Sequence, residues 1–82
     1  MRIYMQMPTV EDRPPRFYHL HLQEDLLEGW TLVRESGYQG YSGKVRKDHF
    51  ASRDHAMEAL MQARDAQIKR GYRVVFAQGD NA

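Results

Sequence analysis

The stretch from Gly29 to Phe50 most constrains what this chain can fold into, because it has the pattern of a strand, a glycine-rich turn and a second strand. Residues 30–35 (WTLVRE) are aromatic and β-branched, as in a half-buried strand. Three glycines follow at positions 37, 40 and 43, and they permit positive φ angles that other residues resist. Residues 44–50 (KVRKDHF) are predicted to form the return strand. The stretch is therefore predicted to be an antiparallel hairpin with a tight or bulged turn.

Further strands are predicted on both sides of this hairpin. Residues 16–23 alternate as a strand does, with Tyr18, Leu20 and Leu22 on one face and Phe17, His19 and His21 on the other. Residues 72–76 (YRVVF) predict a final strand. Residues 2–7 also alternate with a period of two, and their terminal position suggests either an edge strand or a frayed lead-in. The prolines in residues 8–15 predict a loop.

One amphipathic helix is predicted after the hairpin. Ser52 suits the N-cap position, and Gly71 suits the position just past the helix end. Between them lies an apolar stripe at helical spacing, which consists of Ala56, Met57, Leu60, Ala63 and Ile68, with Met61 beside it. This stripe needs a sheet face to cover it. The expected fold is therefore α+β: a small antiparallel sheet of four or five strands with one helix packed on one face.

The domain organisation follows from this pattern. Residues 1–82 are expected to form a single domain with its core in residues 16–77, a loop at 8–15 and a flexible tail at 78–82. The absence of cysteine excludes disulfides, thiolate catalysis and sulfur-ligated zinc. The first residues lack the apolar run of a signal peptide, and no apolar stretch reaches the roughly 18 residues of a membrane span. We therefore expect a cytoplasmic protein with no membrane partner.

The charge is distributed unevenly along the chain. The net charge is +1, below the strongly basic balance of dedicated nucleic-acid binders. Residues 1–41 hold four arginines against six acids, whereas residues 42–82 hold eight cations against five acids. The sequence therefore permits a local basic face in its second half.

The glycine-rich turn has two interpretations. Gly37 and Gly40 would let backbone amides approach a ligand, while Tyr38 and Tyr41 would offer flat faces to a base or a sugar. Alternatively, the glycines serve only the geometry of the turn.

The basic return strand also has two interpretations. Lys44 and Arg46 share one face of this strand and Lys47 points to the other, while Arg53 adds a cation at the start of the helix. These side chains would either contact phosphate groups or protect an exposed edge strand from aggregation.

Other chemistry finds little support in the sequence. His19 and His21 have a spacing that can chelate a metal, but no acid or cysteine completes a ligand set. Ser36, Asp48 and His49 lack the sequence context of an activated nucleophile. We therefore expect no metal, no cofactor and no enzymatic activity.

The predicted elements, in their order and spacing, resemble the WGR domain family. The resemblance covers roughly Phe17 to Phe76 and rests on the segments FYHLHL (17–22), WTLVR (30–34), GYQG (37–40), FAS (50–52) and KRGY (69–72). That family occurs in several poly(ADP-ribose) polymerases, in molybdate-regulator-like bacterial proteins and as short stand-alone bacterial proteins. The resemblance implies the same α+β fold and a nucleic-acid-binding role.

The chain departs from the family at the motif that gives the family its name. Aligning Gly37 and Gly40 with the family's glycines puts Ser36 where tryptophan usually stands and Tyr38 where arginine usually stands. In the polymerases this tryptophan packs against a sugar near a DNA strand end, and the arginine engages backbone phosphate. Only the glycine scaffold carries over to this chain.

These observations lead us to expect a non-catalytic module that contacts the DNA phosphate backbone through the hairpin. The alternative is a protein-interaction or structural module, which the low net charge and the missing arginine favour. DNA and a partner protein are the expected partners, and no particular oligomeric state is indicated. The residues expected at the contact are Arg34, Gly37, Tyr38, Gly40, Tyr41, Lys44, Arg46 and Lys47.

Overall fold

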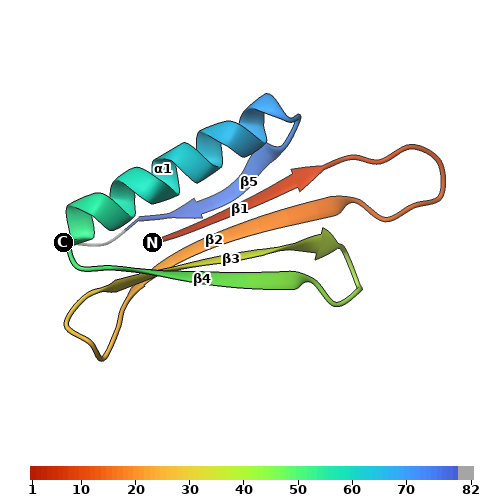
Figure 1. Ribbon diagram of the computed structural model, residues 1–82. Coiled ribbons are helices and arrows are strands. Elements are labelled where there is room, and N and C mark those ends of the chain that lie inside the picture. Colours follow the sequence, from red (N-terminus) through yellow and green to blue (C-terminus); the bar gives the residue numbers. More distant parts are fainter. Residues whose placement is uncertain (80–82) are drawn as a thin grey trace.

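The computed structural model describes residues 1–79, which form a five-stranded antiparallel sheet with one helix on one face (Figure 1). The elements are β1 (Arg2–Met7), β2 (Arg16–Glu24), β3 (Trp30–Tyr38), β4 (Lys44–Phe50), α1 (Arg53–Lys69) and β5 (Arg73–Gln78). Their order across the sheet is β4-β3-β2-β1-β5. This arrangement confirms the predicted α+β class. The helix of the described chain is not long and apolar enough to cross a membrane.

The position of β1 corrects the prediction for residues 2–7. β1 lies between β2 and β5, so it is neither an edge strand nor a frayed lead-in. Ile3 and Met5 are buried, so the core begins there rather than at residue 16. At the other end, Gln78 still belongs to β5, and the rest of the predicted tail beyond Gly79 lies outside the described residues.

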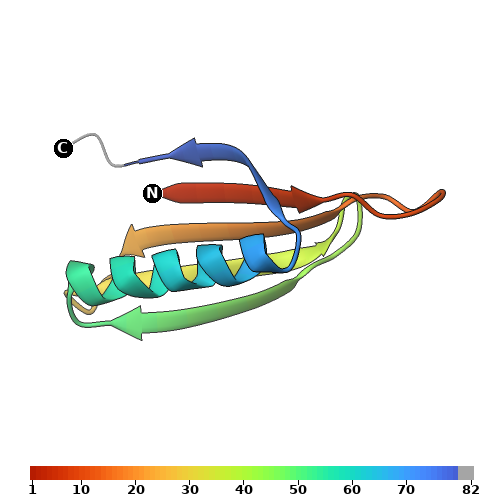
Figure 2. The ribbon, with the colours of Figure 1, turned by 90° about the horizontal axis from the view of Figure 1, so that it is seen from above.

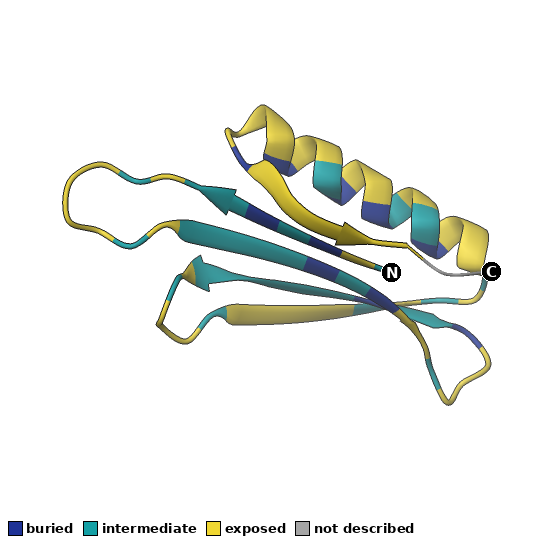
Figure 3. Ribbon diagram, turned by 180° about the vertical axis from the view of Figure 1, so that it is seen from behind, coloured by how far each residue is buried: buried dark blue, intermediate teal, exposed yellow. Residues whose placement is uncertain are grey.

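The core lies between α1 and one face of the sheet. Its buried apolar side chains are Ile3, Met5, Leu20, Leu22, Leu32, Ala56, Leu60, Ala63 and Tyr72. In Figure 3 the buried segments of α1 line the side of the helix that faces the sheet. Because side chains alternate across a strand, every second residue of β1 and β2 faces this core and its neighbours face away. Each large apolar side chain contributes about 1.5–3 kcal/mol by leaving water.

The helix ends are stabilised as the sequence predicts. The Ser52 hydroxyl oxygen accepts a hydrogen bond from the His55 amide at 3.2 Å. After the helix, Gly71 takes a φ of 111°, which residues with a Cβ rarely adopt. α1 packs over β2, β3 and β4, and the chain then crosses to the opposite edge of the sheet to form β5 (Figure 2).

Two loops meet at one end of the sheet. The β1–β2 loop and the β3–β4 turn lie at the same end (Figure 1). The Gln39 amide donates to the Pro15 carbonyl at 2.9 Å, and the Arg16 guanidinium lies 5.7 Å from the ring centroid of Tyr38. These contacts bring the predicted loop at residues 8–15 beside the glycine-rich turn.

Candidate functional site

The glycines of the β3–β4 turn allow its two arms to approach closely. A Cβ on Gly43 would lie 2.7 Å from the Ser36 carbonyl oxygen, and one on Gly37 would lie 3.0 Å from the Gly43 Cα. Gly40 has a φ of 84° and open space where a side chain would stand. The geometry of the turn is therefore sufficient to account for these glycines without a ligand.

The two tyrosines of the turn are accessible from solvent. Tyr38 is 37% exposed and Tyr41 is 70% exposed. They line a hollow of about 240 Å³ together with Arg13 and Pro14 of the β1–β2 loop. Arg13 and Arg16 were missed by the sequence analysis, because nothing in a local pattern shows that this loop folds against the turn.

Three predicted cations come together on the sheet face that carries α1. In the β3–β4 pairing Arg34 is opposite Arg46, and Ser36 is opposite Lys44. Directly paired residues point to the same side of a sheet, so the three cations share one surface. They line an open hollow of about 330 Å³, here called the basic hollow, which is formed by Tyr18, Arg34, Ser36, Lys44, Val45 and Arg46.

One carboxylate partly neutralises the basic hollow. Asp48 Oδ2 lies 3.2 Å from Arg46 Nε and 3.6 Å from Arg34 Nη2. The Arg46 side chain is 70% exposed, so water screens its pair with Asp48, and such pairs contribute at most about 1 kcal/mol to stability. Arg34 Nε is buried and has no hydrogen-bond partner within residues 1–79. Three cations against one carboxylate leave the hollow with a surplus of positive charge.

Lys47 does not belong to the basic hollow. It is paired with Val33, and that pair faces the side of the sheet away from α1, as the alternation along the strand predicts. The run of cations in the sequence is therefore divided between two surfaces.

The Asp25 carboxylate accepts several hydrogen bonds at the opposite end of the sheet, in the loop between β2 and β3. Asp25 Oδ1 accepts from the Leu27 and Gly29 amides at 2.9 and 3.1 Å, and its Oδ2 accepts from Thr31 Oγ1 at 2.9 Å. His49 Nδ1 lies 2.6 Å from the same Oδ2. Desolvation raises the pKa of Asp25, but the hydrogen bonds from Thr31, His49 and the two amides lower it below its ordinary value.

The structure does not assemble the catalytic or metal-binding sets weighed from the sequence. His49 contacts Asp25, whereas Asp48 points to the other side of β4 and contacts Arg34 and Arg46. The rings of His19 and His21 stack with centroids 6.3 Å apart. Within residues 1–79, no group of three or more histidine, aspartate or glutamate side chains is placed to hold a metal ion.

Comparison with known families agrees with this architecture, a small α+β domain with an exposed basic hairpin. The family model of the WGR domain matches residues 1–78, and the chain belongs to this family. WGR domains are generally nucleic-acid-binding modules. The match extends beyond the segment from Phe17 to Phe76 and includes β1. No curated protein and no solved structure matched the chain.

Proposed function

We propose that this WGR domain is a non-catalytic module that binds the phosphate backbone of DNA through the β3–β4 hairpin. The observation that carries the proposal is the basic hollow, in which Arg34, Lys44 and Arg46 surround an open space of about 330 Å³ with one carboxylate beside them. Membership of the family supports nucleic acid as the polyanion that this charge attracts.

The arginines of the hollow suit phosphate. A guanidinium presents several N–H donors in a planar fork, which matches two oxygens of one phosphate group. Arg46 contacts Asp48 through Nε, and its side chain is 70% exposed. The exposed Arg46 and Lys44 side chains are therefore accessible to a phosphate from solvent.

The substitutions in the family motif define which DNA would be bound. Ser36, at the position of the family's tryptophan, is a small side chain that lines the basic hollow. It offers no ring to pack against a sugar at a strand end, whereas contacts to phosphate need no strand end. The proposed module therefore binds intact, nicked and blunt duplexes with similar affinities.

A second candidate function is protein interaction through the turn. The exposed rings of Tyr38 and Tyr41, grouped with Arg13 and Pro14, have the composition of interface anchors. Binding of this kind would be lost on Tyr41→Ala and would depend little on salt, whereas phosphate contacts are strongly salt-dependent.

Fluorescence anisotropy with labelled intact, nicked and blunt duplexes at several salt concentrations tests the proposal. The test variant is Lys44→Ala/Arg46→Ala. The matched control is Lys69→Ala/Arg70→Ala, which removes the same charge at the end of α1, where the chain crosses to the far edge of the sheet. We expect the test variant to weaken binding at least tenfold at low salt and to reduce the log–log salt slope by about 2.

The control should bind within about twofold of the unmodified protein, since a surface change away from the contact has little effect. Equal binding by the test variant and the unmodified protein would contradict the proposal, as would an affinity that does not change with salt.

A further inference from the structure

The sheet face opposite α1 carries a group of aromatic and imidazole rings, here called the ring row: Tyr4, Phe17, His19, His21 and Phe76. Tyr4 stacks on Phe17 with centroids 6.2 Å apart and meets the edge of His19 at 5.9 Å. His19 stacks in turn on His21. Phe76 is paired with Tyr4 across β1 and β5 and is 51% exposed. The rings come from three neighbouring strands and form one continuous surface.

This face is uncovered within the described chain. The ring row alternates along β1 and β2 with the buried residues Ile3, Met5, Leu20 and Leu22, so it points away from α1. An antiparallel sheet with one solvated face normally has polar side chains on that face. Rings at these positions add nothing to the core under α1, and they leave flat apolar surface in contact with water.

Cations surround the ring row. Arg2 of β1 is paired with His21 of β2. His21 is paired with Val33 of β3, and Val33 with Lys47 of β4, so Lys47 lies on the same face. Arg73 is paired with Gln6 at the end of β1. Within residues 1–79, Glu35 is the only acid among the strand residues on this face, and the Asp25 carboxylate lies at one end of it, against Thr31 and His49. Arg2, Lys47 and Arg73 still outnumber these two acids, so the face has a small positive balance.

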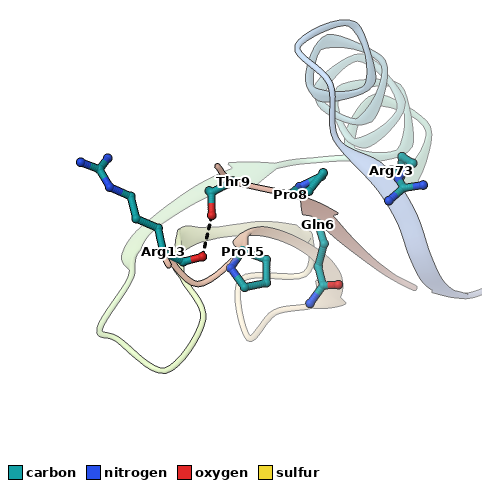
Figure 4. A pocket seen from close by; sticks show the side chains of 6 residues that line it. All are labelled: Gln6, Pro8, Thr9, Arg13, Pro15 and Arg73. Atoms are coloured by element: carbon teal, nitrogen blue, oxygen red, sulfur yellow. Dashed lines mark hydrogen bonds between the residues drawn. The ribbon is translucent and has the colours of Figure 1, made fainter. Parts of the chain in front are cut away.

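A hollow continues the ring row at the end of β1. It has a volume of about 260 Å³ and is lined by Gln6, Pro8, Thr9, Arg13, Pro15 and Arg73 (Figure 4). Thr9 Oγ1 donates to the Arg13 carbonyl at 2.7 Å, which helps to fix the loop that forms one wall. Arg73 comes from β5 and is paired with Gln6, whereas the Arg13 side chain points away from the other labelled residues (Figure 4), so Arg73 is the cation that this hollow places beside the ring row.

The two histidines act here as neutral rings. Burial lowers the pKa of both imidazoles, and the nearby Arg2 lowers it further, while Glu35 opposes the shift at His19. The N-terminal amine and the neighbouring imidazole also lower the pKa of His21. At neutral pH the row therefore presents uncharged π faces, with the positive charge placed around them.

We propose that this face binds single-stranded nucleic acid, with unpaired bases stacked on the ring row and phosphates held by Arg2, Lys47 and Arg73. Stacking on aromatic side chains tolerates any base sequence, and cations beside the rings follow the backbone. Other antiparallel sheets bind two or three bases on aromatic side chains of adjacent strands. The ring row likewise offers three aromatic rings on three adjacent strands, Phe17 on β2, Tyr4 on β1 and Phe76 on β5. The inference rests on the proposed function and adds a second surface, on the other side of the sheet from the basic hollow.

The test compares the unmodified protein with two variants on two ligands. The ligands are a labelled oligothymidylate, which has no duplex structure, and a labelled blunt duplex. The ring variant is Tyr4→Leu/Phe76→Leu, which keeps apolar volume but removes two π faces. The charge variant is Lys44→Ala/Arg46→Ala in the basic hollow. Phe76→Leu alone is the second ring variant, because Phe76 lies on the exposed edge strand and its change leaves the core intact.

We expect the ring variant to bind oligothymidylate at least tenfold more weakly and to bind the duplex within about twofold of the unmodified protein. Phe76→Leu alone should weaken oligothymidylate binding by about threefold or more. The charge variant should lose duplex binding and keep most of its affinity for oligothymidylate. If the charge variant loses duplex binding and the ring variant does not, the proposed function is supported whatever the ring row does.

The inference is overturned if the unmodified protein does not bind oligothymidylate, or if both ring variants bind it as the unmodified protein does. It is also overturned if sedimentation shows that the ring variant differs only in self-association, because the face would then join copies of the chain.

Discussion

Replacing Asp48 by asparagine is predicted to strengthen DNA binding. Asp48 is the carboxylate that contacts both Arg34 and Arg46, at 3.6 and 3.2 Å. In the proposed complex it competes with phosphate for these guanidinium groups and repels the incoming charge. An asparagine at this position would keep the shape of the side chain and remove its negative charge, which ends the repulsion and weakens the competition.

The size of this effect follows from the charges and their exposure. Two unit charges about 4 Å apart interact by about 1 kcal/mol in bulk water and more where water is partly excluded. Because Arg46 is largely exposed, the lower figure applies, and it corresponds to about a fivefold gain in affinity at low salt. The exposed Arg46 pair contributes at most about 1 kcal/mol to the free energy of unfolding, and loss of the less exposed Arg34 pair, whose side chains are 26% and 28% exposed, adds to this cost.

The assay is anisotropy with a labelled duplex at two salt concentrations, with Asp65→Asn as the control. Asp65 pairs with Arg64 at 2.9 Å and its side chain is 58% exposed on α1, so the control makes the same change of charge outside the basic hollow. Asp48→Asn should bind more tightly than Asp65→Asn at low salt, and the difference should shrink at high salt. Equal affinities of the two variants at low salt would refute the placement of phosphate in the basic hollow.

Three further predictions concern the fold. Leu60→Ala should lower the free energy of unfolding by about 2–5 kcal/mol and the melting temperature by roughly 10 °C or more, because Leu60 is fully buried. If Leu60→Ala destabilised the fold no more than Met61→Ala does, this packing would be contradicted. Gly43→Ala should lower the free energy of unfolding by about 1–3 kcal/mol, because the added Cβ would lie 2.7 Å from the Ser36 carbonyl oxygen. An unchanged midpoint in a denaturant titration would disprove this close approach. The lowered pKa of Asp25 means that the folded state binds this proton less tightly than the unfolded chain, so Asp25 stabilises the fold above about pH 4 and this stability is lost as the pH falls through the folded pKa. Asp25→Asn should therefore flatten the dependence of melting temperature on pH below about pH 4, and an unaltered profile would argue against its hydrogen bonds.

The hairpin and the helix were predictable because their signals are local. Ser52 and Gly71 mark the ends of α1, and the alternation of the return strand separates Lys47 from Lys44 and Arg46. Each of these signals depends on residues a few positions apart in the sequence.

The position of β1 and the surroundings of the turn were not predictable in this way. A period of two shows that residues 2–7 are extended, but it does not show that β5 pairs with them after a helix that crosses the sheet. The contact of Arg16 with Tyr38 likewise depends on the fold of the β1–β2 loop. The ring row was seen only in part, because Phe17, His19 and His21 share a strand, whereas Tyr4 and Phe76 join them through pairing distant in sequence.

The most direct test of the central claim is a nuclear magnetic resonance titration of the labelled protein with a blunt DNA duplex. The account predicts that the largest chemical-shift changes occur at Arg34, Lys44 and Arg46, that they saturate with DNA and that they diminish as salt is added. Largest changes elsewhere, with the signals of these three residues unmoved at saturating DNA, would contradict it.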